Sequence, residues 1–153
     1  MGTGHHTGIH HINIVVSDLD AAVAFFSLLG FSLRRSKRIS GKWLDAVTGF
    51  DTVKAEYRAL ASPGSPVTIE LLRFITPPPG EAAGTGEANR IGYRHIAVAV
   101  DDIRKRRSEL EAAGVEFISE VQTNSYGALM CYARGPDGIL VELLQPEGDG
   151  EKS

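Results

Sequence analysis

The chain has 153 residues, of which 42% are hydrophobic and 23% charged, and this composition is typical of a single globular domain. Its 16 basic and 19 acidic residues are scattered and give a formal net charge of −3, so neither nucleic acid nor a membrane surface is an expected partner. The single cysteine, Cys131, excludes an intrachain disulfide and a thiolate-rich metal site, and without a signal-peptide core or a membrane-length apolar run we expect a soluble, cytoplasmic protein.

The first half of the chain predicts four strands and one helix in the order βαβββ. A strand begins at His11, and Ser17 or Asp18 can cap a helix that Gly30 ends. Apolar residues recur at helical spacing between them, at Leu19, Ala22, Val23, Phe26 and Leu29. β-rich stretches follow at about 31–39, 53–61 and 66–75. The loop at about 40–52 carries Trp43, which we expect to be a hydrophobic plug, with a place in the pocket lining as the alternative.

The second half predicts the same order after a linker. Residues 76–92 carry three consecutive prolines and four glycines, which favours an extended connection. A strand at about 93–100 precedes a helix that begins after Asp101 or Asp102 and ends at Ala113. Its basic run, Arg104 to Arg107, is expected to be a solvated face. Strands are predicted near 115–121, 128–134 and 139–145, and the last two are joined by a turn at 135–138.

The two halves are related by an internal repeat. Residues 11–19 and 95–103 share one pattern, a histidine-headed β-type run closed by an acidic cap, at a displacement of 84 positions. The Glu-Leu-Leu sequence within 68–72 returns within 140–144. We therefore expect one domain, residues 1–153, made of module one (about 9–75), the linker (about 76–92) and module two (about 93–145).

Four residues with metal-ligand chemistry fall at equivalent places in the repeat. His11 and His95 head their strands, whereas Glu70 and Glu142 interrupt aliphatic strands, where a carboxylate without a partner would be costly. The four can converge on one divalent metal ion only if the modules pack about a pseudo-twofold axis. His10 is expected to point away from His11, since successive side chains of a strand alternate between faces.

At these residues the chain resembles the vicinal-oxygen-chelate superfamily, which includes glyoxalase I, methylmalonyl-CoA epimerase, extradiol dioxygenases and bleomycin-binding proteins. The resemblance covers about residues 9–146 and depends on the 11–19 and 95–103 segments, the Glu70 strand and the 135–138 turn leading into Glu142. It implies an α+β fold in which two βαβββ modules pair into a cup-shaped, eight-stranded mixed sheet. It also implies a homodimer and a metal held by His11, Glu70, His95 and Glu142.

This ligand set favours an enzyme over a sequestration protein, because bleomycin-binding members lack these ligands. Two imidazoles and two carboxylates suit zinc, nickel, cobalt, manganese or iron, and four protein ligands leave two positions of an octahedral ion open. A small substrate with two neighbouring oxygens, of the acyl-CoA or the cyclitol and hydroxyketone type, would chelate there. We expect an epimerase or isomerase that deprotonates carbon next to a carbonyl through a metal-stabilised enolate, with Glu142 as the first base and Glu70 as its partner.

Three other functions stay open. A glyoxalase I-type lyase is disfavoured because Val15 and Phe74 occupy positions where glutathione-binding relatives carry Arg and Asn. An extradiol-type dioxygenase needs three open positions on iron, and Glu70 would fill one of them. A non-catalytic small-molecule binding or resistance protein would hold its ligand through the metal. Glu56 is a further catalytic candidate, near the position of an additional epimerase glutamate, although a slip of one residue would turn it to the other face.

Overall fold

The chain divides into two compact units, residues 1–80 and 81–153. The structure, a computed structural model, describes residues 8–82 and 87–148. The border between the units falls within the expected linker at 76–92, of which residues 83–86 lie outside the described residues. Among the described residues, no helix is long and apolar enough to cross a membrane.

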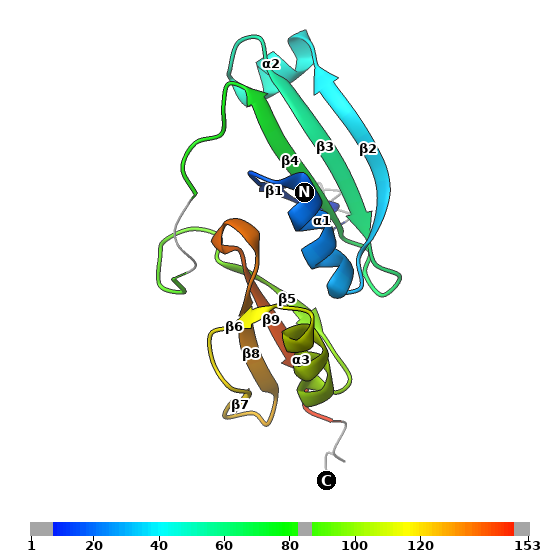
Figure 1. Cartoon of the computed structure of the whole chain (residues 1–153), viewed down its shortest axis with the longest axis vertical. Helices are drawn as coiled ribbons and strands as arrows, with labels where there is room; N and C mark the ends of the chain where they lie inside the picture. Colours follow the sequence, from blue (N-terminus) through cyan, green and yellow to red (C-terminus); the bar gives the residue numbers. More distant parts are fainter. Residues whose placement is uncertain (1–7, 83–86, 149–153) are drawn as a thin grey trace, which may run out of the picture. The chain divides into compact units, whose positions relative to one another are not determined.

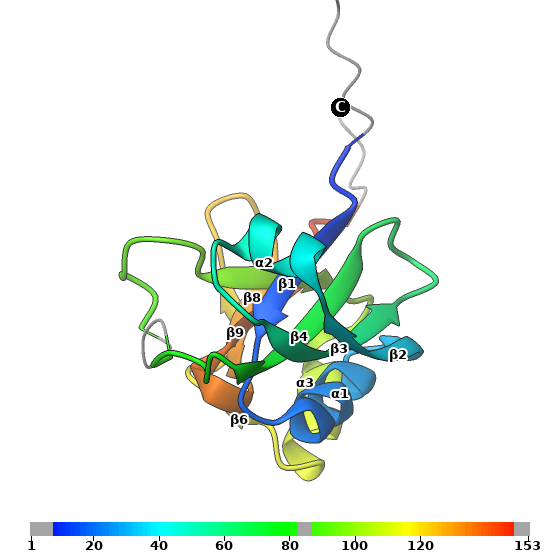
Figure 2. The ribbon, with the colours of Figure 1, turned by 90° about the horizontal axis from the view of Figure 1, so that it is seen from above.

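Unit one is a four-stranded mixed sheet with a helix on one face. Its strands lie in the order β1-β4-β3-β2, and only the β1–β4 pair is parallel. Helix α1 lies across one face of the sheet (Figure 1, Figure 2). The strands are β1 (His11–Val15), β2 (Ser32–Ser40), β3 (Lys54–Ala61) and β4 (Thr68–Thr76), and the helices are α1 (Leu19–Leu28) and α2 (Lys42–Thr48).

Helix α1 begins and ends as its sequence predicts. Asp18, rather than Ser17, is the N-cap, and its carboxylate accepts a 3.0 Å hydrogen bond from the backbone N–H of Ala21. Gly30, just after the helix, has a φ of +91°, a conformation that favours glycine. The apolar face of α1 and the sheet face beneath it form the core of this unit, in which the largest fully buried side chains are Phe26, Leu60, Ile69 and Leu71.

Helix α2 occupies the segment predicted as a loop, and Trp43 is not a plug. The helix has seven residues, and Leu44 is the one that is buried. So short a segment shows too little hydrophobic periodicity for the helix to be predicted. Thr48 Oγ1 donates a 2.7 Å hydrogen bond to the Leu44 carbonyl, and Gly49, with a φ of +75°, ends the helix. Trp43 is 62% exposed, so its side chain does not pack into the core.

Unit two repeats this plan with one strand more than expected. Strands follow the order β5-β9-β8-β6, with β7 also pairing with β8, and β5–β9 is the parallel pair. Asp102 caps the helix, and its carboxylate accepts from the backbone N–H of Lys105 at 3.0 Å. The elements are β5 (His95–Ala99), α3 (Ile103–Ala112), β6 (Glu116–Phe117), β7 (Gln122–Thr123), β8 (Leu129–Arg134), a 3-10 turn (Pro136–Gly138) and β9 (Leu140–Gln145).

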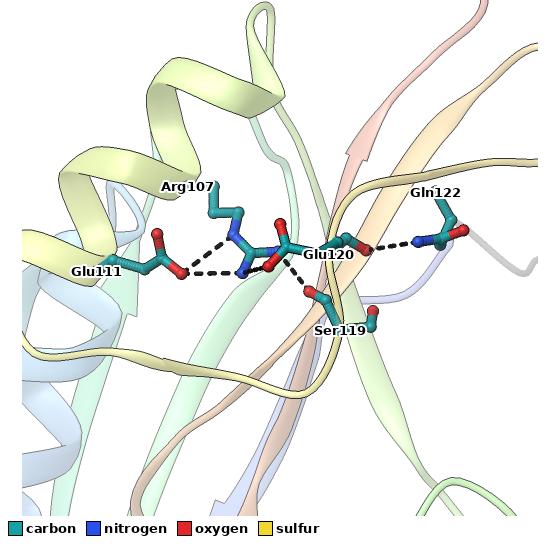
Figure 3. A network of polar contacts seen from close by, with 5 residues as sticks. All are labelled: Arg107, Glu111, Ser119, Glu120 and Gln122. Atoms are coloured by element: carbon teal, nitrogen blue, oxygen red, sulfur yellow. Dashed lines mark hydrogen bonds and ion pairs between the residues drawn. The ribbon is translucent and has the colours of Figure 1, made fainter.

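Of the strand predicted at 115–121 only β6 (Glu116–Phe117) forms, and Arg107 binds the segment between β6 and β7. Its guanidinium donates a hydrogen bond to the backbone carbonyl of Ser119 (Figure 3). The same group binds Glu111 at 2.9 Å and Glu120 at 3.2 Å, and it lies 4.8 Å from the centre of the Phe117 ring. The Arg107 side chain is only 11% exposed, so this part of the predicted solvated face is instead a structural anchor.

The predicted α+β class is confirmed: two mixed sheets of four and five strands carry the few helices. The predicted packing of Cys131 as a small apolar side chain also agrees with the structure, where it is 3% exposed. Burial raises the pKa of this thiol above its ordinary value.

Candidate functional site

The first candidate pair is formed by β1 and β4 in unit one. Asn13 lies directly opposite Glu70 in the parallel ladder, and His11, two residues earlier, shares its face. The Nε2 atom of His11 lies 3.3 Å from Oε2 of Glu70. The Asn13 amide donates a 3.3 Å hydrogen bond to the backbone carbonyl of Glu70, across the same pair of strands.

The second pair is formed by β5 and β9 in unit two with the same register. Ala97 lies opposite Glu142, again two residues after the histidine. The Nε2 atom of His95 lies 3.0 Å from Oε2 of Glu142. Glu142 is 8% exposed and lies between buried aliphatic neighbours on β9, so His95 supplies the partner that a buried carboxylate needs.

The donor atoms of each pair are spaced as two ligands of one divalent ion would be. Atoms that each lie about 2.0–2.1 Å from one ion are roughly 2.8–3.4 Å apart in octahedral or tetrahedral coordination. The observed separations of 3.3 Å and 3.0 Å fall within this range. Among residues 8–82 and 87–148, the structure contains no group of three or more His, Cys, Asp or Glu side chains that could hold a metal. Each unit therefore supplies two fitting ligands.

Tyr57 orients Glu70 and was not singled out by the sequence analysis. Its hydroxyl donates a 2.6 Å hydrogen bond to Oε1 of Glu70, which leaves Oε2 facing His11. Burial, this hydrogen bond and the charge of Glu70 together raise the pKa of Tyr57 to about 12. Tyr57 therefore remains a neutral donor at physiological pH. The alternation of side chains along β3 could have pointed to Tyr57 once the face of its neighbour Glu56 was known.

A tyrosine also lies beside the second pair. Tyr132 on β8 is directly opposite Glu142 on β9, and its ring centre lies 5.1 Å from that of His95. The two units thus repeat a His–Glu pair with an aromatic neighbour from the next strand.

Glu56 lies on the other face of the sheet from Glu70. On β3, Ala59 is opposite Glu70, whereas Glu56 is opposite Arg73. Residues an odd number of positions apart on a strand face opposite sides, so Glu56 faces away from Ala59 and Glu70. Arg73 binds the Glu56 carboxylate through two hydrogen bonds of 2.7 and 3.1 Å, and Arg38 lies 3.4 Å away. The hydrogen bond from Arg73 lowers the pKa of Glu56. Glu56 therefore faces away from the His11–Glu70 pair.

His10 does not point away from His11, contrary to the sequence-based expectation. Their Nδ1 atoms lie 2.9 Å apart, and the rings meet edge to face with centres 5.2 Å apart. His10 lies just before β1, where the alternation of a regular strand does not apply. This contact engages Nδ1 of His11 and leaves its Nε2 toward Glu70.

Comparisons with known proteins show which proteins this chain is similar to. A crystal structure of a glyoxalase family protein from Bacillus cereus has a TM-score of 0.89 and 32% sequence identity, covering 97% of this chain and 99% of that one. The uncharacterized protein YaeR of Escherichia coli (strain K12) is 29% identical over 139 residues, 90% of this chain and 95% of YaeR. A 2-epi-5-epi-valiolone epimerase from Actinomyces sp is 25% identical over 144 residues, 89% of this chain and 78% of the epimerase.

A protein-family model matches most of the chain. The model of the Glyoxalase/Bleomycin resistance protein/Dioxygenase superfamily matches residues 8–143, which include both His–Glu pairs and the segments in which the resemblance was found. The resemblance stated from the sequence is thereby confirmed. On this match, the chain belongs to the Glyoxalase/Bleomycin resistance protein/Dioxygenase superfamily.

Proposed function

We propose that this protein is a divalent-metal-dependent epimerase or isomerase that removes a proton from carbon next to a carbonyl in a small substrate with two chelating oxygens. The observation that carries the proposal is the repeated His–Glu pair, at 3.3 Å in one unit and 3.0 Å in the other. The similarity to a valiolone epimerase supports the epimerase branch of the superfamily.

In this proposal, His11, Glu70, His95 and Glu142 hold one zinc, nickel, cobalt, manganese or iron ion. When bound, such an ion would polarise the substrate carbonyl and make the neighbouring C–H more acidic. The chain's own contribution is to hold the imidazole Nε2 atoms and carboxylates in fixed positions. Tyr57 does this for Glu70 through its 2.6 Å hydrogen bond.

Glu142 is proposed to take the proton from the substrate. Its Oε2 atom lies beside His95, and Oε1 has no hydrogen-bond partner among the described residues, so this oxygen is available as a base. Both oxygens of Glu70 are engaged, by Tyr57 and by His11. Glu70 is proposed to deliver a proton taken up from solvent to the other face of the planar carbon, which inverts its configuration, and Glu142 then releases the abstracted proton to solvent.

The test is proton exchange in D₂O with the metal-loaded protein. Methylmalonyl-CoA, 2-oxo-cyclitols and 2-hydroxyketones would be incubated separately, and loss of the α-proton followed by NMR. We expect exchange with one of these substrates, and a drop of at least ~10²-fold in Glu142→Gln, because general-base contributions are of this size. Glu109→Gln, which removes a half-exposed carboxylate on α3, is the matched control and should retain exchange.

Two results would overturn the proposal. One is exchange that is as fast in Glu142→Gln as in the parent. The other is no exchange with any candidate substrate. Oxygen consumption on a catechol in the presence of Fe²⁺ would then establish dioxygenase chemistry instead.

A further inference from the structure

A cationic side chain lies in the same cross-strand row as Glu70. Arg35 on β2 is directly opposite Ala59 on β3, and Ala59 is directly opposite Glu70 on β4. Residues paired across neighbouring strands present their side chains on the same face of the sheet. Arg35 therefore shares the face of Glu70, with only the methyl group of Ala59 between them.

The position of Tyr57 independently confirms which face this is. Tyr57, two residues before Ala59 on β3, donates a hydrogen bond to Glu70. The side chains of Tyr57 and Ala59 therefore lie on the face of the sheet that carries the His11–Glu70 pair. Lys37 is opposite Tyr57 and thus adds a second positive charge to the same face. Arg38, by contrast, faces the other way, where it lies 3.4 Å from Glu56.

The positive charge of Arg35 and Lys37 is not balanced within unit one. Both side chains are exposed, and neither forms a hydrogen bond or ion pair with any residue that the structure describes. Among the described strands of this sheet, Glu70 is the one carboxylate on their face, and its two oxygens are engaged by Tyr57 and His11. An oxoanion placed near Arg35 would therefore meet an available guanidinium.

The spacing suits a substrate that reaches from one end of the row to the other. Two strand separations place the backbones of Arg35 and Glu70 roughly 9–10 Å apart, and both side chains project from the same face of the sheet. A carbonyl compound held at Glu70 would thus bring a group a few bonds further along the molecule to Arg35. Ala59, the residue between them in this row, presents only a methyl group.

We propose that Arg35, aided by Lys37, is a specificity-determining residue that selects substrates bearing a terminal oxoanion, a phosphate or a carboxylate, beyond the chelating oxygens. Arginine suits this role because its planar guanidinium can form two parallel hydrogen bonds to such a group. The inference rests on the proposed function in one respect, namely that the chelating end of the substrate lies at Glu70.

The experiment compares three hydroxyketones that share the chelating group. Hydroxyacetone is neutral, dihydroxyacetone phosphate adds a phosphate, and 5-hydroxylevulinate adds a carboxylate. Binding to the zinc-loaded protein would be measured by calorimetry, which does not depend on turnover. We expect at least one of the anions to bind about tenfold or more tightly than hydroxyacetone, the effect of one charge-assisted contact.

Two variants on the same strand locate the contact. Arg35→Gln should lose about tenfold in affinity for the preferred anion while its affinity for hydroxyacetone stays the same. Arg38→Gln removes an equal charge from the opposite face and should retain the preference. The anion that loses more affinity in Arg35→Gln identifies the group as phosphate or carboxylate.

The outcomes separate this inference from the proposed function. A preference for one anion that depends on Arg35, without proton exchange, would support the substrate class and contradict the epimerase. Equal or undetectable binding of all three ligands, or an equal loss of preference in Arg35→Gln and Arg38→Gln, would overturn the inference even if proton exchange is observed.

Discussion

The hydroxyl of Tyr57 on β3 donates a 2.6 Å hydrogen bond to Oε1 of Glu70 on β4. The other oxygen of this carboxylate is thereby held toward Nε2 of His11, 3.3 Å away. A carboxylate fixed through one oxygen presents the second as a single ligand atom with little rotational freedom. Tyr57 is thus a positioning residue for one half of the proposed metal site.

Replacing Tyr57 with Phe should weaken metal binding while the fold is retained. Loss of an outer hydrogen bond to a ligand typically lowers metal affinity by about 10–100-fold. Zinc titration by calorimetry measures this change, and Tyr126→Phe, at a position that is 79% exposed, is the matched control. Equal zinc affinity in Tyr57→Phe and the parent would show that Glu70 does not need this orientation.

Glu56→Gln should reduce stability in a manner that depends on pH. The hydrogen bond from Arg73 lowers the pKa of Glu56, so the folded state favours the ionised carboxylate. This contribution is fully present above the ordinary carboxyl pKa of about 4.3 and is lost as the pH falls through the lower folded-state value. The difference in melting temperature between parent and variant should therefore be constant at neutral pH and shrink in acid. A difference that grows in acid would contradict this ion pair.

Arg107→Gln should destabilise the protein by about 1–2 kcal/mol, because it removes several polar contacts from a largely buried side chain. The guanidinium joins α3, through Glu111, to the segment that carries Ser119 and Glu120 (Figure 3). Urea denaturation measures the change, with the exposed Arg104→Gln on the same helix as control. Equal denaturation midpoints for parent, Arg107→Gln and Arg104→Gln would show that the network is dispensable.

The residues of the two His–Glu pairs could be singled out from the sequence because their signal is local and repeated. A histidine at the head of one strand and a glutamate within an aliphatic strand recur in both halves, and the strands pair in the same register in each. The N-caps Asp18 and Asp102 could also be predicted, since an acidic residue before an apolar helical pattern is a local feature of the sequence.

Some features that could not be predicted depend on contacts between distant segments, and one is too short to leave a pattern in the sequence. The face of Glu56 depends on the register of β3 against β4, which shifts between Lys54 and Ala55. The segment that follows β6 contacts Arg107, which lies on a different element. Helix α2 is too short for a periodic pattern, and its local hydrogen bonds around Leu44 and Gly41 are not visible in composition.

The central claim is that the two His–Glu pairs together hold one divalent ion. Zinc titration of the metal-free protein by calorimetry, with bound zinc confirmed by elemental analysis, tests it most directly in the parent and in His11→Ala, Glu70→Ala, His95→Ala and Glu142→Ala. The account predicts one ion per chain in the parent and a loss of more than about tenfold in affinity in every variant, because each removes one ligand of a shared site. Two ions per chain, or any one of the four variants binding zinc as tightly as the parent, would contradict it.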